Sequence, residues 1–179
     1  VLPERHWFNG LGRRITDITI SANYPVPLAG NRLPGRLLVI DVNFSHGEPV
    51  SYLLPVSFLP DHDAEEFLRD HPGAGLFRVT GDNDVGLNGV ICDGMAEEQF
   101  TAQLLQRILT GEPLVGSDGE IRPLATSRLE PELVDVPDDQ QDFWLWPRLL
   151  RGGQVHSTVA YGDRLILKLY RRREKGVSP

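Results

Sequence analysis

The sequence predicts an α+β protein built mainly from antiparallel β-hairpins, with one clear helix. The chain of 179 residues holds 14 prolines and 18 glycines, which favour many short elements and turns over long helices. Runs of β-branched and aliphatic residues recur in pairs around turn-forming residues, as they do in hairpins. Residues 95–110 show the clearest helical spacing of apolar side chains. A helical bundle is therefore disfavoured.

The N-terminal part is predicted to form antiparallel strands. Residues 13–21 are rich in β-branched side chains and predict a strand. Residues 23–36 hold three prolines and two glycines and predict a loop. Residues 37–44 alternate apolar and polar side chains in their second half, which is typical of a strand. We expect this strand to pair with residues 50–59 across the turn at residues 45–48.

The middle of the chain predicts a second hairpin and then the main helix. Residues 64–69 predict a short helix, and residues 76–80 and 85–91 predict paired strands. In the helix at residues 95–110, Glu97 and Glu98 fall in the first turn, where carboxylates suit the helix dipole. Gly111 suits the C-terminal cap. The apolar stripe at Phe100, Leu104 and Ile108 is expected to face the core. Residues 121–129 predict one more strand, and the acidic residues 130–142 predict a linker.

Composition and charge exclude several functional classes. The net charge of −7 gives no general attraction for nucleic acids or anionic lipids, so neither a nucleic-acid nor a membrane partner is expected. No apolar run approaches the ~20 residues of a membrane span. Cys92 is the only cysteine, so an intrachain disulfide or a cysteine-based zinc site is impossible. With no signal-peptide pattern at the start, we expect a cytoplasmic protein.

The C-terminal end predicts a hairpin and carries most of the local positive charge. Residues 157–161 and 164–170 flank a two-residue loop at Gly162-Asp163, and glycine at the first loop position fits a type II′ turn. Residues 148–175 carry eight basic side chains against two acidic ones. This basic end is either a solvated face or a surface for a phosphate-bearing ligand.

Lys168 lies in the middle of the second strand of this hairpin. Alternation places it on one face between Ile166 and Tyr170. Such a lysine can snorkel into water or block edge pairing on an edge strand. It can equally point at a phosphate, since phosphoryl transfer needs a fixed cation below a loop that covers the phosphates. Residues 152–158 contain two glycines and two hydroxyl side chains and could supply that loop, although they match neither the P-loop nor the protein-kinase pattern.

Two stretches resemble one enzyme family. The run from Val159 to Arg172 is similar to the small-lobe hairpin of the bacterial maltokinases, which also occur fused to trehalose synthase. The run from Arg5 to Ile15 resembles the opening of the cap domain of the same family. Landmarks at residues 53–56, 76–78 and 93–94 occur in the expected order, so the resemblance covers most of the chain.

The resemblance implies a fold related to aminoglycoside phosphotransferases and eukaryotic-type kinases. Residues 1–92 would form an N-terminal cap domain with a curved antiparallel sheet. Residues 93–179 would form an intermediate subdomain and part of a protein-kinase-like small lobe. The implied activity is transfer of the γ-phosphoryl group of ATP, with Mg²⁺, to maltose to give maltose 1-phosphate. Because actinobacterial glucosamine kinases have a similar cap, the acceptor sugar stays open.

The same resemblance implies the site residues. Lys168 would contact the nucleotide phosphates, and Ser157 and Thr158 would lie in the loop above them. The family usually carries Ser-Asn where this chain has Val155-His156. His156 is then either a substitute donor or a solvent-exposed side chain.

The family has further parts that the printed sequence lacks. After the hairpin it continues into a helix whose Glu pairs with the lysine, and then into a lobe with the catalytic Asp and the metal ligands. No His-Gly-Asp-like or Asp-Phe-Glu-like segment occurs in the 179 residues, so no catalytic residue and no metal ligand is assigned. The acidic residues around His62 show no spacing that fixes a metal site.

Two hypotheses follow from these observations. The first is the N-terminal part of a sugar kinase, which we expect to be inactive alone because phosphoryl transfer needs groups from both lobes. The second is a non-catalytic cap module that docks to a trehalose synthase-like partner or to carbohydrate.

Overall fold

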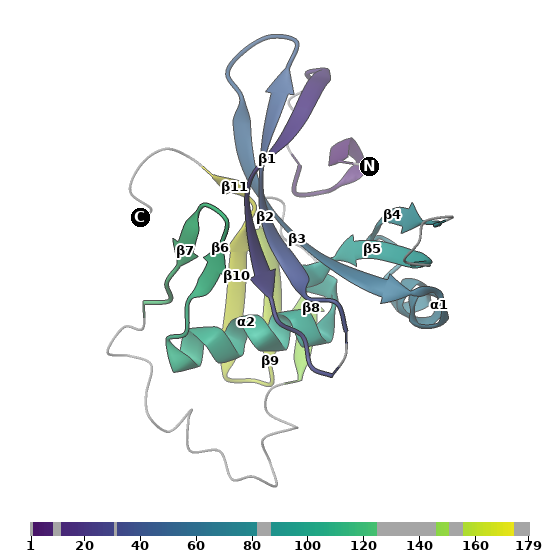
Figure 1. Ribbon diagram of the computed structural model, residues 1–179, viewed down its shortest axis with the longest axis vertical. Helices are drawn as coiled ribbons and strands as arrows, with labels where there is room; N and C mark the ends of the chain where they lie inside the picture. Colours follow the sequence, from purple (N-terminus) through teal and green to yellow (C-terminus); the bar gives the residue numbers. More distant parts are fainter. Residues whose placement is uncertain are drawn as a thin grey trace, which may run out of the picture.

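The computed structural model describes residues 2–8, 12–30, 32–81, 87–124, 146–150 and 156–173. Within these ranges the chain forms three antiparallel sheets and two α-helices (Figure 1). This arrangement agrees with the predicted α+β class. No helix in the described ranges is long and apolar enough to cross a membrane.

The largest sheet contains the three long strands near the N-terminus. Its order is β1-β2-β3-β5-β4, and β11 pairs with β3 off this path. The strands are β1 (Ile15–Val26), β2 (Gly35–Phe44), β3 (Val50–Pro60), β4 (Gly75–Val79), β5 (Gly89–Asp93) and β11 (Arg172–Arg173). The predicted pairing of residues 37–44 with residues 50–59 is confirmed, with Ile40 opposite Tyr52.

The predicted loop at residues 23–36 was partly wrong. β1 continues to Val26, and β2 already begins at Gly35, which lies opposite Val26. Pro25 pairs with Arg36 in this ladder. Proline is tolerated on such a strand because β1 is an edge strand of the described sheet, and proline is found at sheet edges.

Two helices follow the long strands. α1 (Asp61–Asp70) contains the predicted short helix and is longer at both ends. Of the predicted strand at residues 85–91, residues 85 and 86 lie outside the described ranges, residues 87 and 88 are not in a strand, and β5 begins at Gly89. The main helix is split into a 3-10 turn, η2 (Gly94–Ala96), and α2 (Glu98–Thr110).

The ends of α2 show one confirmed prediction and one correction. Gly111 forms the left-handed C-terminal cap with φ 73°, as expected. Glu97 is not in the first turn but is the N-cap, and its carboxylate accepts bonds from Gln99 N at 3.1 Å and Phe100 N at 2.8 Å. A carboxylate at this position satisfies two helix N–H groups that would otherwise lack partners.

A short hairpin follows α2 that the sequence did not reveal. β6 (Leu114–Gly116) pairs with β7 (Gly119–Ile121). The predicted strand at residues 121–129 was wrong in its described part, because β7 ends at Ile121 and residues 122–124 are not in a strand. Residues 125–129 and the predicted linker at 130–142 lie outside the described ranges.

The third sheet holds the C-terminal hairpin. It contains β8 (Pro147–Leu150), β9 (His156–Tyr161) and β10 (Leu165–Tyr170), in the order β10-β9-β8. The hairpin loop has three residues and not two, because Tyr161 pairs with Leu165 and leaves Arg164 in the loop. The predicted two-residue type II′ turn is therefore wrong, although Gly162 has a positive φ of 56°, a conformation that favours glycine.

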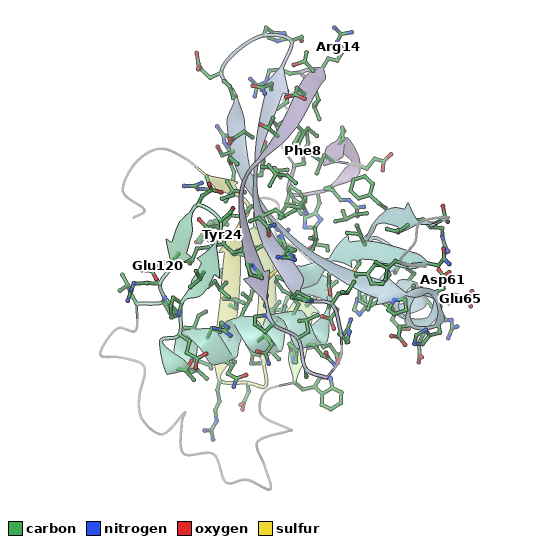
Figure 2. All side chains as sticks on the ribbon, viewed as in Figure 1. Phe8, Arg14, Tyr24, Asp61, Glu65 and Glu120 are labelled. Carbon is green, nitrogen blue, oxygen red and sulfur yellow. The ribbon has the colours of Figure 1, made fainter. Side chains whose placement is uncertain are left out.

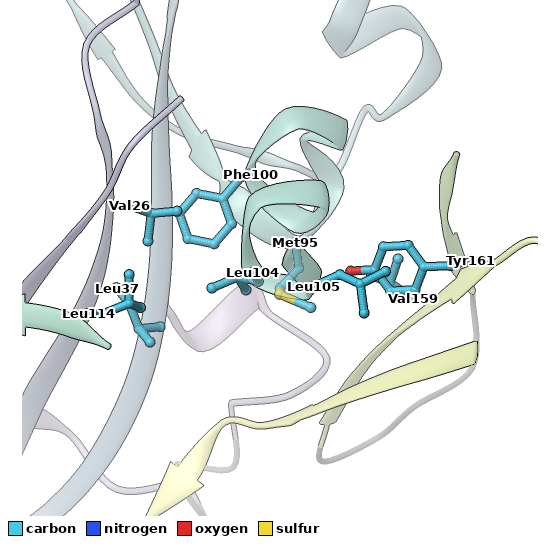
Figure 3. Packing of buried hydrophobic residues seen from close by; sticks show 9 residues of the cluster. All are labelled: Val26, Leu37, Met95, Phe100, Leu104, Leu105, Leu114, Val159 and Tyr161. Carbon is cyan, nitrogen blue, oxygen red and sulfur yellow. The ribbon is translucent and has the colours of Figure 1, made fainter. Parts of the chain in front are cut away.

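The main core lies where α2 packs between the long strands and the third sheet. Figure 3 shows Phe100 and Leu104 of α2 beside Val26, and Leu105 near Tyr161. Tyr161 donates a hydrogen bond from its hydroxyl to the carbonyl oxygen of Thr101 at 2.7 Å. Burial raises the pKa of the Tyr161 hydroxyl well above its ordinary value. This core therefore joins residues on both sides of the predicted boundary at residue 92.

A second core lies under the N-terminal segment, which begins with η1 (Leu2–Glu4). Trp7 is buried there against Tyr52, with 6.2 Å between ring centroids. Phe8 also contacts Tyr52, at 5.1 Å between centroids. The N-terminal segment thus packs against the large sheet. In Figure 1 it is the purple ribbon next to the mark N.

Candidate functional site

Among the described residues, one face of the third sheet packs against α2 and the other face is partly exposed. Leu165, Leu167 and Leu169 of β10 pack towards the α2 core together with Val159. The alternate residues form the other face, which we call the outer face; its described members are Arg148, Leu150, His156, Thr158, Ala160, Ile166, Lys168 and Tyr170. The two faces follow directly from the period of two along each strand.

Lys168 lies on the outer face, in the middle of the edge strand β10. It is exposed, and its cross-strand partner is Thr158, which in turn lies opposite Leu150. Along its own strand it is flanked by Ile166 and Tyr170, which are 62% and 61% exposed. The predicted alternation of β10 is therefore confirmed. Among the described residues no hydrogen bond or ion pair joins Lys168 to a partner.

The residue type at position 168 is unusual for this chain. The sequence contains sixteen arginines and two lysines, Lys168 and Lys175. A lysine ammonium is a compact charge on a flexible stem, suited to reaching a phosphate oxygen from a rigid strand. It is also the side chain that protects edge strands, and β10 is an edge strand of the described sheet. Both interpretations of Lys168 stay compatible with its position.

The structure separates the other predicted site residues. Thr158 and His156 share the outer face with Lys168, and the ring of His156 lies 5.7 Å from that of Tyr170. Ser157 points the opposite way and is 5% exposed. Its hydroxyl accepts hydrogen bonds from Arg171 Nε at 3.0 Å and Nη2 at 2.8 Å. The nucleotide role of Ser157 stays a prediction, but its contacts here are internal.

Arg171 is the centre of a buried polar network that the sequence did not suggest. Its Nη2 donates to both carboxylate oxygens of Asp93, at 2.8 and 2.6 Å, and its guanidinium carbon lies 4.7 Å from the centroid of Trp7. Arg171 is 1% exposed. One signal was present in the sequence, since Arg171 continues the inward row of Leu165, Leu167 and Leu169. An arginine in that row predicts a buried partner.

Next to this network lies a groove with a volume of about 860 Å³. Its walls come from the N-terminal segment, the turn between α1 and β4, the start of η2 and the ends of β8 and β9. We call it the Arg171 groove. Its lining residues include Trp7, Gly73, Asp93, Leu150, His156 and Arg171.

The described residues offer no metal centre. No group of three or more His, Cys, Asp or Glu side chains in the described ranges is arranged to hold a metal ion. Asp61 and Glu65 lie on α1, away from the third sheet (Figure 2), and Asp61 pairs with Arg78 at 2.9 Å. Of residues 152–158, which were predicted to supply the loop over the phosphates, residues 152–155 lie outside the described ranges, whereas His156, Ser157 and Thr158 belong to strand β9 and not to a loop.

The chain was compared with models of known protein families, and no family model matches it.

Proposed function

We propose that this chain is the N-terminal part of an ATP-dependent sugar kinase of the maltokinase type, in which the outer face of the third sheet forms one half of the nucleotide site. The observation that carries the proposal is the exposed, unpaired Lys168 at the centre of an otherwise apolar strand face. In protein kinases the phosphate-binding lysine likewise lies on the third strand of the small-lobe sheet, after a loop that covers the phosphates. Here β8, residues 151–155, β9 and β10 follow in that order.

The outer face offers complementary surfaces to a nucleotide. Ile166 and Leu150 give an apolar surface for a base, and Lys168 gives the cation for the phosphates. Thr158, directly opposite Lys168, adds a hydroxyl donor, and His156 adds a ring nitrogen at the end of the same face. The Mg²⁺ ligands and the catalytic Asp would come from a second lobe, which would also complete the acceptor site. We place the reaction in the cytoplasm, with maltose or glucosamine as acceptor.

Isothermal titration of the chain with Mg-ATP tests the nucleotide face. We expect weak binding that is lost in Lys168→Met, because the charge disappears while the length of the side chain is kept. Arg78→Met is the matched control, since Arg78 is also an exposed cation on a strand but belongs to β4 of the large sheet. Equal affinity of wild type and Lys168→Met, with both proteins folded, would contradict the nucleotide role.

A second candidate function is a non-catalytic module that docks to a trehalose synthase-like partner. The edge strand β1 favours it, because Ile18 and Ile20 are 44% and 61% exposed there. An exposed apolar edge strand is a ready surface for another strand. In this case Ile20→Lys weakens binding of the partner protein, and Mg-ATP does not change that binding. The kinase proposal predicts instead that the chain binds Mg-ATP itself.

A further inference from the structure

Two residues that line the Arg171 groove each carry a buried nitrogen atom without a hydrogen-bond partner among the described residues. A guanidinium has five N–H donors. Nε of Arg171 donates to Ser157, and Nη2 donates to Asp93 and Ser157, but Nη1 is buried without a partner among the described residues. Nδ1 of His156, which also lines the groove, is likewise buried without a partner.

A buried donor without an acceptor costs free energy, so an acceptor is expected beside Nη1. The guanidinium cannot turn to find one elsewhere. It is fixed by the two bonds to the Asp93 carboxylate on one edge and by the Trp7 ring against its face. The neighbouring groove, at about 860 Å³, lies within the range of about 300–1,000 Å³ that holds small ligands.

The charges around the groove indicate a neutral ligand. Arg171 is already compensated by Asp93 at 2.6 Å, and the other charged lining residues are Glu4, Arg5 and Asp70. Counting histidines as neutral, acidic side chains exceed basic ones by one, so a phosphate or a carboxylate gains no net attraction. The walls combine such polar groups with apolar surface from Met95, Leu149 and Leu150.

From these contacts we propose that the Arg171 groove is a binding site for a neutral, hydroxyl-rich ligand such as a mono- or disaccharide. A sugar hydroxyl accepts from Arg171 Nη1, another pairs with His156 Nδ1, and the apolar wall packs against a pyranose ring. Lys168 does not line the groove, whereas Leu150 and His156 belong both to the groove and to the outer face, so the two proposed sites adjoin and share these two side chains.

Two variants and one control test the site in the full chain. Arg171→Lys keeps a cation for Asp93 but removes the Nη1 donor. Gly73→Trp adds an indole ring at a residue that lines the groove, where a Cβ meets no atom within 4 Å and the backbone conformation suits any residue. Val115→Trp adds the same ring at an exposed position of β6 outside the groove.

Titrations with maltose, with glucose and with inorganic phosphate, each monitored by two-dimensional amide NMR, give the readout. We expect shifts confined to groove residues and to the Trp7 indole, with affinity weakened about tenfold or more in Arg171→Lys, as for loss of a charged hydrogen bond. Gly73→Trp abolishes the shifts and Val115→Trp preserves them. If Arg171→Lys does not fold, the loss or persistence of the shifts in Gly73→Trp tests the proposal.

Three results would overturn the proposal. The first is the absence of groove shifts with either sugar near its solubility limit, which identifies a merely hydrated groove. The second is binding of inorganic phosphate at the groove in place of sugar. The third is sugar binding that persists unchanged in Gly73→Trp.

Discussion

Arg171 shows how a single buried cation determines what its neighbours can do. Its guanidinium joins Asp93, at the end of β5, to Ser157, at the start of β9, and its backbone carbonyl accepts a bond from Leu53 N at 2.6 Å. Taking such a pair out of water is costly, and removing one partner leaves an uncompensated charge. Because Ser157 is bound in this network, only three of the four predicted nucleotide-binding residues lie on the outer face: His156, Thr158 and Lys168.

Arg171→Met should destabilise the protein by about 3–5 kcal/mol, because the Asp93 carboxylate is left buried without its partner. Arg78→Met should cost no more than about 1 kcal/mol, because the Arg78–Asp61 pair is half-exposed. Urea unfolding of both variants measures the free energies of unfolding. Similar losses in the two variants would show that the Arg171 network contributes little.

The buried thiol of Cys92 makes stability depend on pH in the alkaline range. Burial, helped by the nearby carboxylates Glu97 and Asp93, raises the pKa of the Cys92 thiol from 9.0 to about 12. The unfolded chain therefore loses this proton first as pH rises, so stability is full below pH 9.0 and falls towards about pH 12. In Cys92→Ala the free energy of unfolding, measured by denaturant titration, should fall less steeply between pH 9 and 12. An unchanged dependence on pH would contradict the role of the Cys92 thiol.

At the scale of elements, alternation and turn residues carried most of the information. The pairing of β2 with β3, the C-terminal cap of α2 and the two faces of β10 all follow from local sequence. Errors came where tertiary pairing outweighed local preference. β1 runs through Pro25 because β2 supports it along its whole length, and the hairpin loop gains Arg164 because the register of β10 is fixed by its leucine row in the core.

The close pairing of β3 with β5 gives a test at this scale. A Cβ at Gly89 would overlap the carbonyl oxygen of Leu59 and approach the Phe58 ring within 2.8 Å, so the strands would have to separate. Gly89→Ala should therefore cost about 1–3 kcal/mol in the free energy of unfolding. Gly73→Ala, which adds its methyl group to open space, should stay within about 0.5 kcal/mol. Chemical denaturation distinguishes the two, and equal effects would contradict the packing described.

At the scale of the whole molecule, the end of the chain returns to its beginning. After β10, Arg172 and Arg173 form β11 and pair with Tyr52 and Ser51 of β3. Together with α2, this pairing fixes the third sheet against the large one and leaves the outer face open. A pattern of local periods contains no information on which distant strands pair, so β11, the Asp93–Arg171 contact and the Arg171 groove could not be predicted from the sequence. The outer face could be predicted, because it needs only alternation.

The central claim is that a nucleotide covers Lys168, and amine acylation in the presence and absence of millimolar Mg-ATP tests it most directly. The chain has two lysines, so peptide mass spectrometry can follow Lys168 with Lys175 as the internal control. The account predicts that Mg-ATP slows acylation of Lys168 several-fold and leaves the rate at Lys175 unchanged. Equal rates at Lys168 with and without Mg-ATP would contradict it and leave Lys168 as an edge-strand lysine.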